Sequence, residues 1–590
     1  TAVGYDAMQK TTTGASNVSL GFRSLFSNTT SSNNTAVGYQ AAYSQTSPGN
    51  PNTAIGAKAG YSTTTGTGNV SVGYQALEAN TTASNHVALG YQSLQANTTG
   101  DSNTGLGQRS LYSNTTGDYN TAVGRQALNS NTTADDNTAV GYQAGYSNTT
   151  GGQNTGVGRK ALYTNTTGDN NVSVGFNSMF FNTTGADNAA LGTNALQANT
   201  TGNYNTAVGR QSLLANTTAS QNTAVGYQAA YSTTTGANNT AVGYQSAYYN
   251  TTGHNNSVVG HLSLQQLTSG AYNAGLGVQA AQSTTTGSGN VGVGYQALEN
   301  NTTGNYNTAI GYQSLESSTT TSYNIAMGYR AAYENTSGIE NTAIGSQSQY
   351  STTTGSQNTS VGHNAGYYIS TGSKNTILGR FNGNQASLDI RTSSNRIVLS
   401  DGDGNVGLYI DNNQKVGFGD TRSFSGSFSV NSPRMYVSGN GSNYIWNTAQ
   451  ESSANIYLHR TTSSSGTNFV LFGYNANSVG RISTDTSSTS YVTSSDYRLK
   501  ENVTYDWDAT TRLKQLKPAR FNFILNADKT VDGFLAHEVS SIVPEAITGE
   551  KDAVDENGNI DPQGIDQAKL VPLLVKTIQE LEARITALEG

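Results

Sequence analysis

The chain has 590 residues, of which only 11% are charged, and a formal net charge of −7. The sequence contains no basic tract and no run of 18 apolar residues, which argues against nucleic acid or an anionic membrane as a partner and against a transmembrane span. Cysteine is absent, so neither disulfides nor thiolate metal sites can hold the fold.

A 17-residue repeat dominates the first two thirds of the chain. Glycines recur from Gly4 to Gly379 in 23 copies of roughly N-T-A-V-G-Y-Q-A-L-x-x-N-T-T-G-x-x, with one 18-residue step at the insertion Ser47–Pro51. The residue before each of these glycines is Val, Leu, Ile or Met. Because a disordered low-complexity chain has no reason to keep one apolar position in phase, the pattern predicts a β-solenoid over residues 1–383.

Each coil is expected to contain one short strand at N-T-A-V-G, with Val facing in and Thr facing out. The glycine supplies a turn or a close backbone approach. Leu at the fourth position after the glycine, as in Leu77, exchanges with Tyr at the fifth, as in Ala42–Tyr43, and we interpret both as filling the same interior space. In-register Asn and Thr are expected to form ladders. Whether Y-Q-A-L-x-x-N is a second strand or a helical turn stays open.

A core built from one chain's Val and Leu or Tyr would be thin, which favours a homotrimer whose three solenoids share an axis and bury a second face. At about 4.8 Å per coil, the 23 coils predict a rod roughly 110 Å long. The N-T-A-V-G phrasing resembles the head repeats of trimeric autotransporter adhesins, and it resembles the repeats of bacteriophage tail fibres more closely.

The periodicity stops after Gly379, and residues 384–494 predict a small antiparallel or interwoven β module that would form a stem or knob. Its β-like runs are Arg396–Ser400, Val406–Ile410, Lys415–Gly419 and Asn468–Tyr474. The stretch Asp401–Asn405 alternates acidic and amide side chains like a calcium loop. However, Val406 and Asn412 stand where an EF-hand needs Gly and Glu, so we interpret the stretch as a hairpin turn.

The histidines of the first 494 residues show no metal-ligand spacing, and we expect them to be surface or ladder residues. They are His86, His254, His261, His363 and His459. The sequence predicts neither a metal site nor a cofactor.

The composition changes at Ser495, because 28 of the last 96 residues are charged against 37 of the preceding 494. Such a shift marks a separate domain over 495–590. Near its end, apolar residues at alternating spacings of three and four form the a/d seam of a coiled-coil helix at about 570–589. The seam consists of Val571, Leu574, Ile578, Leu581, Ile585 and Leu588. Ile at the a-like positions with Leu at d mildly favours two strands, which conflicts with a trimer.

Residues 495–590 resemble the C-terminal intramolecular chaperone domain of the endosialidase type, also classed as peptidase family S74. The matching elements, in the family's order, are Ser495–Val503, Leu513–Phe523, Asp532–Ile547 and Lys569–Ile585. The resemblance implies an α+β chaperone that assembles a trimeric fibre and then cuts itself off, and we let it outweigh the two-stranded indication. The family more often has Gln where His537 stands, which argues against a catalytic role for His537.

The resemblance also implies a Ser-Lys dyad, with Ser495 as nucleophile and Lys500 as general base. The cut would fall between Ser494 and Ser495 and leave 1–494 as the mature fibre. A Ser hydroxyl needs a base, and a Lys serves only if burial or a positive neighbour such as Arg498 lowers its pKa from about 10.4. Residues five apart share no face of a strand or helix, so the pair needs an intervening turn or a Lys from a neighbouring chain. Either would make this single-turnover cut depend on assembly.

We therefore expect a mainly β, homotrimeric phage tail fibre, located in the virion or outside the cell. It would bind a host cell-surface receptor, either a polysaccharide or an outer-membrane component. Because the chain begins within a repeat, we expect a missing N-terminal region that joins other tail or baseplate proteins. A cellular trimeric adhesin or extracellular filament stays open as an alternative. A polysaccharide depolymerase is a further alternative, although the acid-poor repeats offer no convincing paired carboxylates.

Overall fold

The computed structural model describes residues 1–46, 51–385, 388–412, 416–418, 467–474, 477–484, 489–493, 495–524, 526–554, 558 and 560–590. Internal contacts divide the chain into two compact units, Thr1–Tyr436 and Val437–Gly590. Within the described residues, no helix combines the length and the apolar character that crossing a membrane requires.

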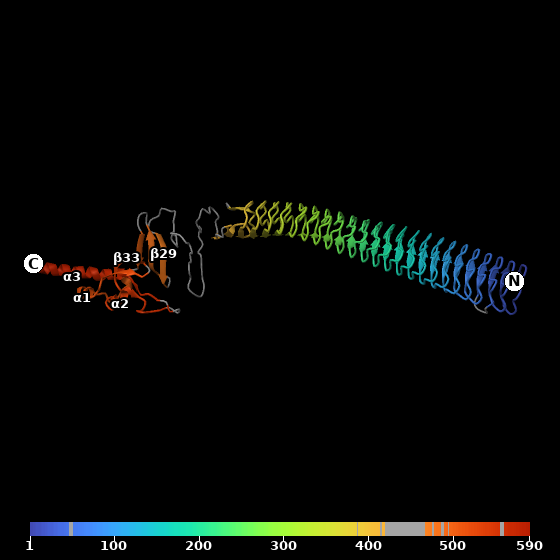
Figure 1. Cartoon of the computed structure of the whole chain (residues 1–590), viewed down its shortest axis with the longest axis horizontal. Helices are drawn as coiled ribbons and strands as arrows, with labels where there is room; N and C mark the ends of the chain where they lie inside the picture. The colour runs from blue at the N-terminus through green and yellow to red at the C-terminus, as the bar shows by residue number, and fades with distance from the viewer. Residues whose placement is uncertain are drawn as a thin grey trace. The chain divides into compact units, whose positions relative to one another are not determined.

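The first unit contains a β-solenoid in which each 17-residue coil contributes one short strand (Figure 1). Neighbouring strands pair in parallel and in register, so that Thr121 faces Thr138 and Val123 faces Val140. The 18-residue step from Thr35 to Thr53 leaves this register unchanged, and residues 47–50 of the insertion lie outside the described residues. The predicted solenoid of 17-residue coils is confirmed.

The strands of the repeats are β1 (Ala2–Val3), β2 (Val18–Leu20), β3 (Thr35–Val37), β4 (Thr53–Ile55), β5 (Val70–Val72), β6 (Val87–Leu89), β7 (Thr104–Leu106), β8 (Thr121–Val123), β9 (Thr138–Val140), β10 (Thr155–Val157), β11 (Val172–Val174), β12 (Ala189–Leu191), β13 (Thr206–Val208), β14 (Thr223–Val225), β15 (Thr240–Val242), β16 (Ser257–Val259), β17 (Ala274–Leu276), β18 (Val291–Val293), β19 (Thr308–Ile310), β20 (Ile325–Met327), β21 (Thr342–Ile344), β22 (Thr359–Val361) and β23 (Thr376–Leu378).

The middle residue of each strand, and not the Val, points into the solenoid. In β8, Ala122 is fully buried while Thr121 and Val123 stay partly exposed. The prediction that Val faces in and Thr faces out is wrong, because residues two apart in a strand lie on the same face. The inward position is Ala, Ser or Gly in nearly all copies, so the interior is narrow and the larger apolar residue of each strand lies outside.

The glycine after each strand is required by close backbone approach. Gly124 has φ of +134°, and a Cβ at this position would collide with the carbonyl group of Gly141 in the next coil. Only glycine tolerates both the dihedral angle and the contact, which confirms the predicted role of this residue.

The segment that follows the glycine is a run of turns, neither a strand nor a helix. Gln126 and Leu128 have φ of 58° and 48°, both in the left-handed region. The amide of Gln126 donates to the carbonyl of Gln108 in the preceding coil (2.9 Å), and the amide of Leu128 donates to that of Ala144 in the following coil (2.9 Å). Each left-handed residue costs roughly 1–2 kcal/mol. This conformation aims amides of the turn toward both neighbouring coils, and the resulting hydrogen bonds offset that cost.

The fourth and fifth positions after the glycine lie in different environments. Leu128, at a fourth position, is buried. The rings at fifth positions are only half-buried and stack on one another, with centroid distances of 5.2 Å for Tyr146–Tyr163 and 4.9 Å for Tyr163–Phe180. The interpretation that both positions fill the same interior space is therefore wrong. Where Gly145 replaces the inner residue, a small gap remains beside Leu128.

Two rows of buried asparagines run through the interior, and the first lies seven residues after the repeat glycine in 13 of the 23 repeats. The Asn131 Nδ2 group donates to Asn114 Oδ1 in the preceding coil (2.8 Å) and to the carbonyl of Ala134 (3.0 Å). The Asn131 Oδ1 atom in turn accepts from Asn148 Nδ2 (2.8 Å). A buried polar group without a partner costs about 1–3 kcal/mol, so this row is stable only when successive coils are in register.

The second row lies four residues before each glycine. The backbone amide of Asn137 donates to Asn120 Oδ1 (3.0 Å), and Asn137 Nδ2 donates to the carbonyl of Gly151 (3.0 Å). Nearer the surface, the Thr132 hydroxyl donates to the carbonyl of Thr149 in the next coil (3.0 Å). The predicted Asn and Thr ladders are confirmed.

The sheet continues past residue 383. β26 (Ile397–Ser400) pairs in parallel with β23, and β27 (Val406–Ile410) and β28 (Val416–Phe418) follow as antiparallel strands. Between β26 and β27, Asp401 Oδ1 accepts hydrogen bonds from the amides of Asp403 (3.0 Å) and Asn405 (2.8 Å). The structure thus confirms the hairpin turn at Asp401–Asn405.

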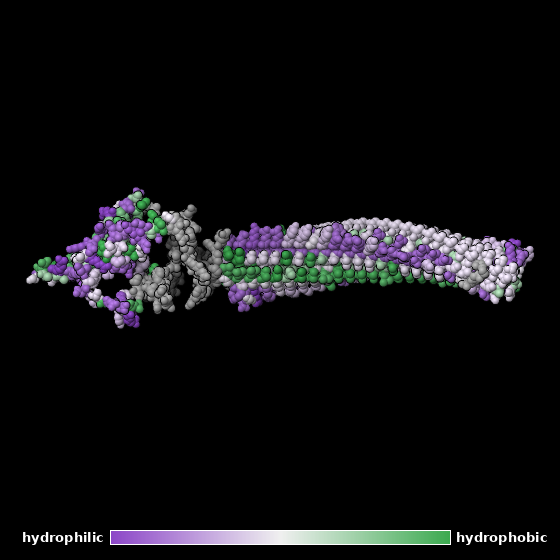
Figure 2. Space-filling view, turned by 90° about the horizontal axis from the view of Figure 1, so that it is seen from below, coloured by the Kyte–Doolittle hydropathy of each residue, from purple (hydrophilic) through white to green (hydrophobic). Residues whose placement is uncertain are grey.

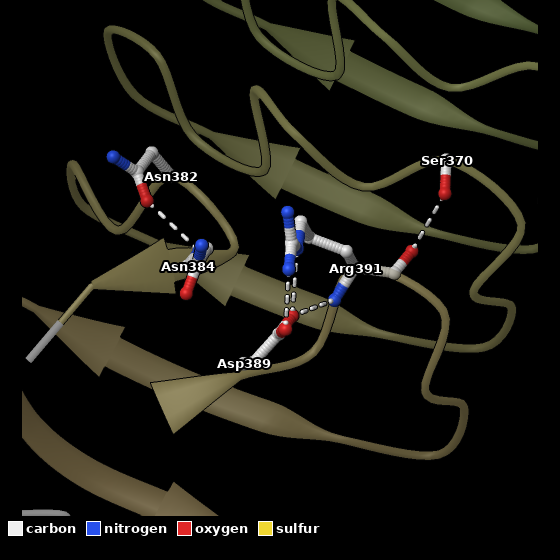
Figure 3. Close-up of polar contacts among 5 residues, drawn as sticks. All are labelled: Ser370, Asn382, Asn384, Asp389 and Arg391. Carbon is white, nitrogen blue, oxygen red and sulfur yellow. Dashed lines mark hydrogen bonds and ion pairs between the residues drawn. The ribbon is translucent and has the colours of Figure 1, made fainter. Parts of the chain in front are cut away.

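A larger core fills this end of the solenoid. Phe381 is fully buried in a cluster with residues from β23, β26 and β27. The small hairpin of β24 (Asn384–Gln385) and β25 (Leu388–Asp389) precedes Arg391, whose Nη2 atom lies 2.7 Å from Asp389 Oδ2 (Figure 3). The Ser370 hydroxyl donates to the carbonyl of Arg391 (3.3 Å). The antiparallel strands β27 and β28, together with the β24–β25 hairpin, end the stack of parallel strands, as a capping repeat does in other solenoids.

The second unit begins, among its described residues, with an antiparallel sheet of β29 (Thr467–Tyr474), β30 (Asn477–Thr484) and β31 (Thr489–Thr493). A smaller α+β body follows. Its elements are η1 (Tyr497–Leu499), α1 (Ala509–Leu513), β32 (Ala519–Phe523), β33 (Asn526–Gly533), α2 (Ala536–Val539), η2 (Pro544–Ala546), β34 (Ile547–Thr548), β35 (Gly564–Ile565), η3 (Gln567–Leu570) and α3 (Val571–Glu589). Its core comprises Ala509, Val539, Val543, Ala546, Leu570 and Leu573.

The described histidines of the repeats are ladder or surface residues, as expected. His261 stacks on Tyr244, His254 packs edge-on against Tyr272, and His363 is exposed, while His459 lies outside the described residues. His86 replaces an Asn of the second row, and its Nδ1 atom accepts a hydrogen bond from the Asn103 amide (3.1 Å). Burial lowers the pKa of His86 from 6.5 to about 4.

His86 should make the solenoid sensitive to acid. The unfolded chain binds a proton at His86 more readily than the folded chain, so the free energy of unfolding should fall by about 3 kcal/mol as the pH drops from 6.5 through 4. His86→Asn restores the row and should remove this part of the pH dependence. Hydrogen exchange of peptides from β5 to β7 at pH 7 and pH 4 measures it, and identical profiles for both proteins would contradict the assignment.

The first asparagine row is interrupted at Thr233, which leaves Asn216 Oδ1 and the Thr233 hydroxyl buried without partners. Thr233→Asn should restore the row between Asn216 and Asn250 and stabilise this region by about 1–2 kcal/mol, the gain from one or two buried hydrogen bonds. Slower hydrogen exchange in peptides covering β13 to β15 reports the gain. Thr235→Asn, at an exposed position of the same coil, is the matched control and should have no effect.

Candidate functional site

The structure brings the two predicted residues of the dyad into direct contact. The Lys500 Nζ atom donates a hydrogen bond to Ser495 Oγ at 2.8 Å. The turn η1 lies between them, so both residues belong to one chain and no Lys from a neighbouring chain is needed for the contact. Their catalytic roles stay a prediction, and Ser494, the other side of the expected cut, lies outside the described residues.

An aspartate and an arginine hold the turn in shape. Asp496 caps η1, its Oδ1 atom accepting a hydrogen bond from the Arg498 amide (2.9 Å), while the Arg498 guanidinium makes two further bonds to the same carboxylate (3.0 and 2.6 Å). The Arg498 side chain and amide hold the pKa of Asp496 below its usual range. The Lys500 amide closes the turn on the Tyr497 carbonyl (3.1 Å).

This pairing changes the role expected for Arg498. Its charge is balanced by Asp496, so it is not the uncompensated positive neighbour that would favour a neutral Lys500. The contact between Asp496 and Arg498 could have been predicted from the sequence, because Asp is a preferred helix cap and Asp496 stands two residues before Arg498. What Arg498 supplies is the geometry of the turn that places Lys500 beside Ser495.

Both members of the dyad are exposed in the single chain. Tyr497 is 81% and Leu499 is 76% exposed on the turn that joins them, and Val503 and Tyr505 are exposed just beyond it. The single chain therefore positions the dyad without desolvating it. A Lys acts as a base only when desolvation or a positive charge disfavours its ammonium form.

His537 lies on α2 and lines a cavity of about 590 Å³ between the β32–β33 hairpin and the segment that precedes β35. Among its hydrogen bonds and those of the dyad that the structure describes, none joins His537 to Ser495 or Lys500.

The helix α3 has two faces with opposite surroundings. Leu573 and Thr577 are buried against the α+β body. The predicted seam lies on the other face, where Ile578 is 62% and Ile585 is 54% exposed, and Val571, Leu574, Leu581 and Leu588 are exposed as well. The predicted helix is confirmed, and its coiled-coil face is unoccupied within the single chain.

Glu580 holds α3 against the α+β body. Its position outside the heptad seam gave no indication of this contact. Its carboxylate accepts hydrogen bonds from the amides of Ala509 (3.0 Å) and Thr510 (2.8 Å) and from the Thr510 hydroxyl (2.6 Å). These bonds lower the pKa of Glu580 to about 2. The contact joins residues about 70 positions apart, which no local pattern encodes.

Comparison with known proteins supports the family resemblance over the first part of the predicted domain at 495–590. Residues 495–548 match the family model Peptidase_S74, described as chaperone of endosialidase, and the match begins at Ser495. A β-solenoid followed by this segment fits a tail-fibre-like protein with an endosialidase-type chaperone domain. No curated protein and no solved structure matched the chain.

Glu580 should stabilise the docking of α3 in a pH-dependent way. Because its folded pKa of about 2 lies below the usual 4.5, the stabilisation is present above pH 4.5 and is lost as the pH falls towards 2. At pH 7, Glu580→Gln should speed hydrogen exchange of α1 and of the first turns of α3. Glu582→Gln, an exposed carboxylate on the same helix, should leave exchange unchanged. Equal effects of the two variants would contradict the contact.

Proposed function

We propose that this chain forms the homotrimeric fibre of a phage tail, assembled by the domain at 495–590, which then releases itself by a cut between Ser494 and Ser495. The observation that carries the proposal is the 2.8 Å contact between Lys500 Nζ and Ser495 Oγ. This contact lies at the first residue of the segment that matches the endosialidase chaperone family. The solenoid supplies the shaft of the fibre.

The proposed cut uses the serine next to the bond that breaks. Lys500 in its neutral form takes the proton of the Ser495 hydroxyl as Oγ attacks the carbonyl carbon of Ser494. The C–N bond breaks, and the proton passes to the amino group of Ser495, which leaves an ester between the two residues. Water then hydrolyses the ester, and the products are the carboxylate of Ser494 and a free Ser495. The residues act once and turn over no substrate.

The exposure of the dyad supports a link between assembly and cutting. Covering Tyr497 and Leu499 with other copies would remove water from Lys500 and favour its neutral form. A cut that waits for this step keeps the chaperone in place until the fibre is complete. Alignment of several chains in register is slow and prone to error, so a removable template helps, and the released fibre is then trapped kinetically.

We infer the partners from the same architecture. A long rod outside the cell or on a virion presents a surface to a host receptor, and the chemistry expected of that receptor is a polysaccharide or an outer-membrane component. Other tail or baseplate proteins would hold the fibre at its N-terminal side.

The proposed cut can be tested on the full chain. The wild type should separate into a 494-residue fibre and a fragment of about 96 residues on a denaturing gel. Ser495→Ala should abolish the fragment, and Lys500→Met should slow its release by about 100-fold or more, the usual contribution of a general base. Lys514→Met, at an exposed lysine of the same domain, is the control and should cut normally. A wild type that forms trimers and releases no fragment would refute the cut.

A further inference from the structure

The outward face of the solenoid sheet carries a continuous apolar band. We define this apolar band as the residue before each repeat glycine, which is the last residue of strands β1–β23. In the single chain none of these residues is buried, and Leu191, for example, is 52% exposed. The outward residue two positions earlier is Thr, Ser, Ala, Val or Ile. Neither outward position of any of these strands holds a charged residue.

The extent of the band is too large for a surface that stays in water. Figure 2 shows it as a hydrophobic stripe that runs along one side of the solenoid. Each coil contributes one side chain that is at most about half exposed, and at roughly 60 Å² per side chain the 23 coils present on the order of 1,000 Å². Soluble monomers rarely expose patches above a few hundred Å², whereas obligate interfaces bury about this area on each subunit. The band therefore has the area of a permanent protein interface.

The periodicity of the band identifies what covers it. A partner must offer apolar groups that match one strand spacing over the whole length, and another copy of this solenoid does so coil by coil. The second unit points to the same occupant, since the exposed heptad seam of α3 is complementary to further copies of itself. Two unoccupied apolar faces in one chain are both satisfied by the same event, self-association.

The apolar band and the heptad seam of α3 together indicate how neighbouring copies of the chain are oriented. An antiparallel pair of solenoids would place their C-terminal ends about 110 Å apart, at about 4.8 Å per coil, and would oppose β6 to β18. A parallel, in-register pair keeps the two α3 helices at the same end and sets each strand beside its own counterpart. The parallel arrangement lets the α3 helices and the apolar bands engage the same set of chains.

We propose that the apolar band is the surface along which the copies of this chain lie side by side, parallel and in register. This inference rests on the homotrimeric fibre proposed above and names the surface that its shaft buries. It also assigns the remaining faces, with their Thr ladders and stacked tyrosines, to the outside of the fibre, where a receptor would meet them.

Site-directed cross-linking tests this arrangement, because the chain has no cysteine of its own. Leu89→Cys places one thiol in the band at β6, and Thr99→Cys places one in a polar turn of the same coil, outside the band; both residues are exposed in the single chain. Each full-length variant is first shown to be trimeric by analytical ultracentrifugation and is then treated with a short bis-maleimide. Leu89→Cys should be captured as covalent dimers on a denaturing gel, and Thr99→Cys should stay monomeric on the gel.

The outcomes separate this inference from the proposed function. A trimer in which Leu89→Cys is not captured, or in which Thr99→Cys is captured equally, would overturn the inference and leave the trimeric fibre standing. A wild type that stays monomeric would overturn both, and its flotation with phosphatidylcholine vesicles would assign the band to a lipid surface. If Leu89→Cys fails to fold, the pair Val174→Cys and Thr184→Cys repeats the comparison at β11.

Discussion

The fold depends on in-register hydrogen bonding between successive coils. Many coils bury two asparagine side chains, and where the rows are uninterrupted these amides find their partners in a neighbouring coil or in their own turn, as Asn131 does with Asn114 and Ala134. A shift of one residue would leave a buried amide unpaired in every coil, which makes the register cooperative along the stack. Backbone strain in the turns is tolerated for the same reason, since left-handed residues such as Gln126 aim their amides at adjacent coils.

The interior of the solenoid is narrow, and this leaves the larger apolar residues of the strands on its outer face. Because Ala, Ser or Gly fills the inward strand position, a single chain has little apolar volume to bury, and amide ladders take much of the interior that a larger protein would fill with side-chain carbon. The Val, Leu, Ile and Met side chains that precede the repeat glycines are left on the outer face of the sheet. The single chain thus satisfies its hydrogen bonds along the axis of the solenoid and leaves its largest apolar surface exposed.

The second unit shows the same division between internal order and unoccupied surface. Glu580 and Leu573 fix α3 to the α+β body, while Ile578 and Ile585 remain exposed on its other face. The turn of Asp496 and Arg498 fixes Lys500 beside Ser495, while the apolar side chains around the dyad stay uncovered. In both places the single chain builds a defined local geometry and leaves apolar side chains exposed to water.

Features that repeat, or that depend only on neighbours along the chain, could be predicted from the sequence. The 17-residue period, the strand before each glycine, the asparagine ladders, the change of character at Ser495 and the helix at 571–589 all follow from local periodicity, composition and propensity. The alternation of side chains along a strand also puts Val123 on the same face as Thr121. The prediction that Val faces in while Thr faces out conflicted with this alternation and was therefore wrong. The tertiary structure alone decided that Leu128 lies inside while Tyr146 lies outside, that Glu580 bonds to Ala509 and Thr510, and that Lys500 reaches Ser495. These features depend on how a turn closes and on which distant groups then meet, and a closed turn with left-handed residues forms only when the neighbouring coils accept its hydrogen bonds.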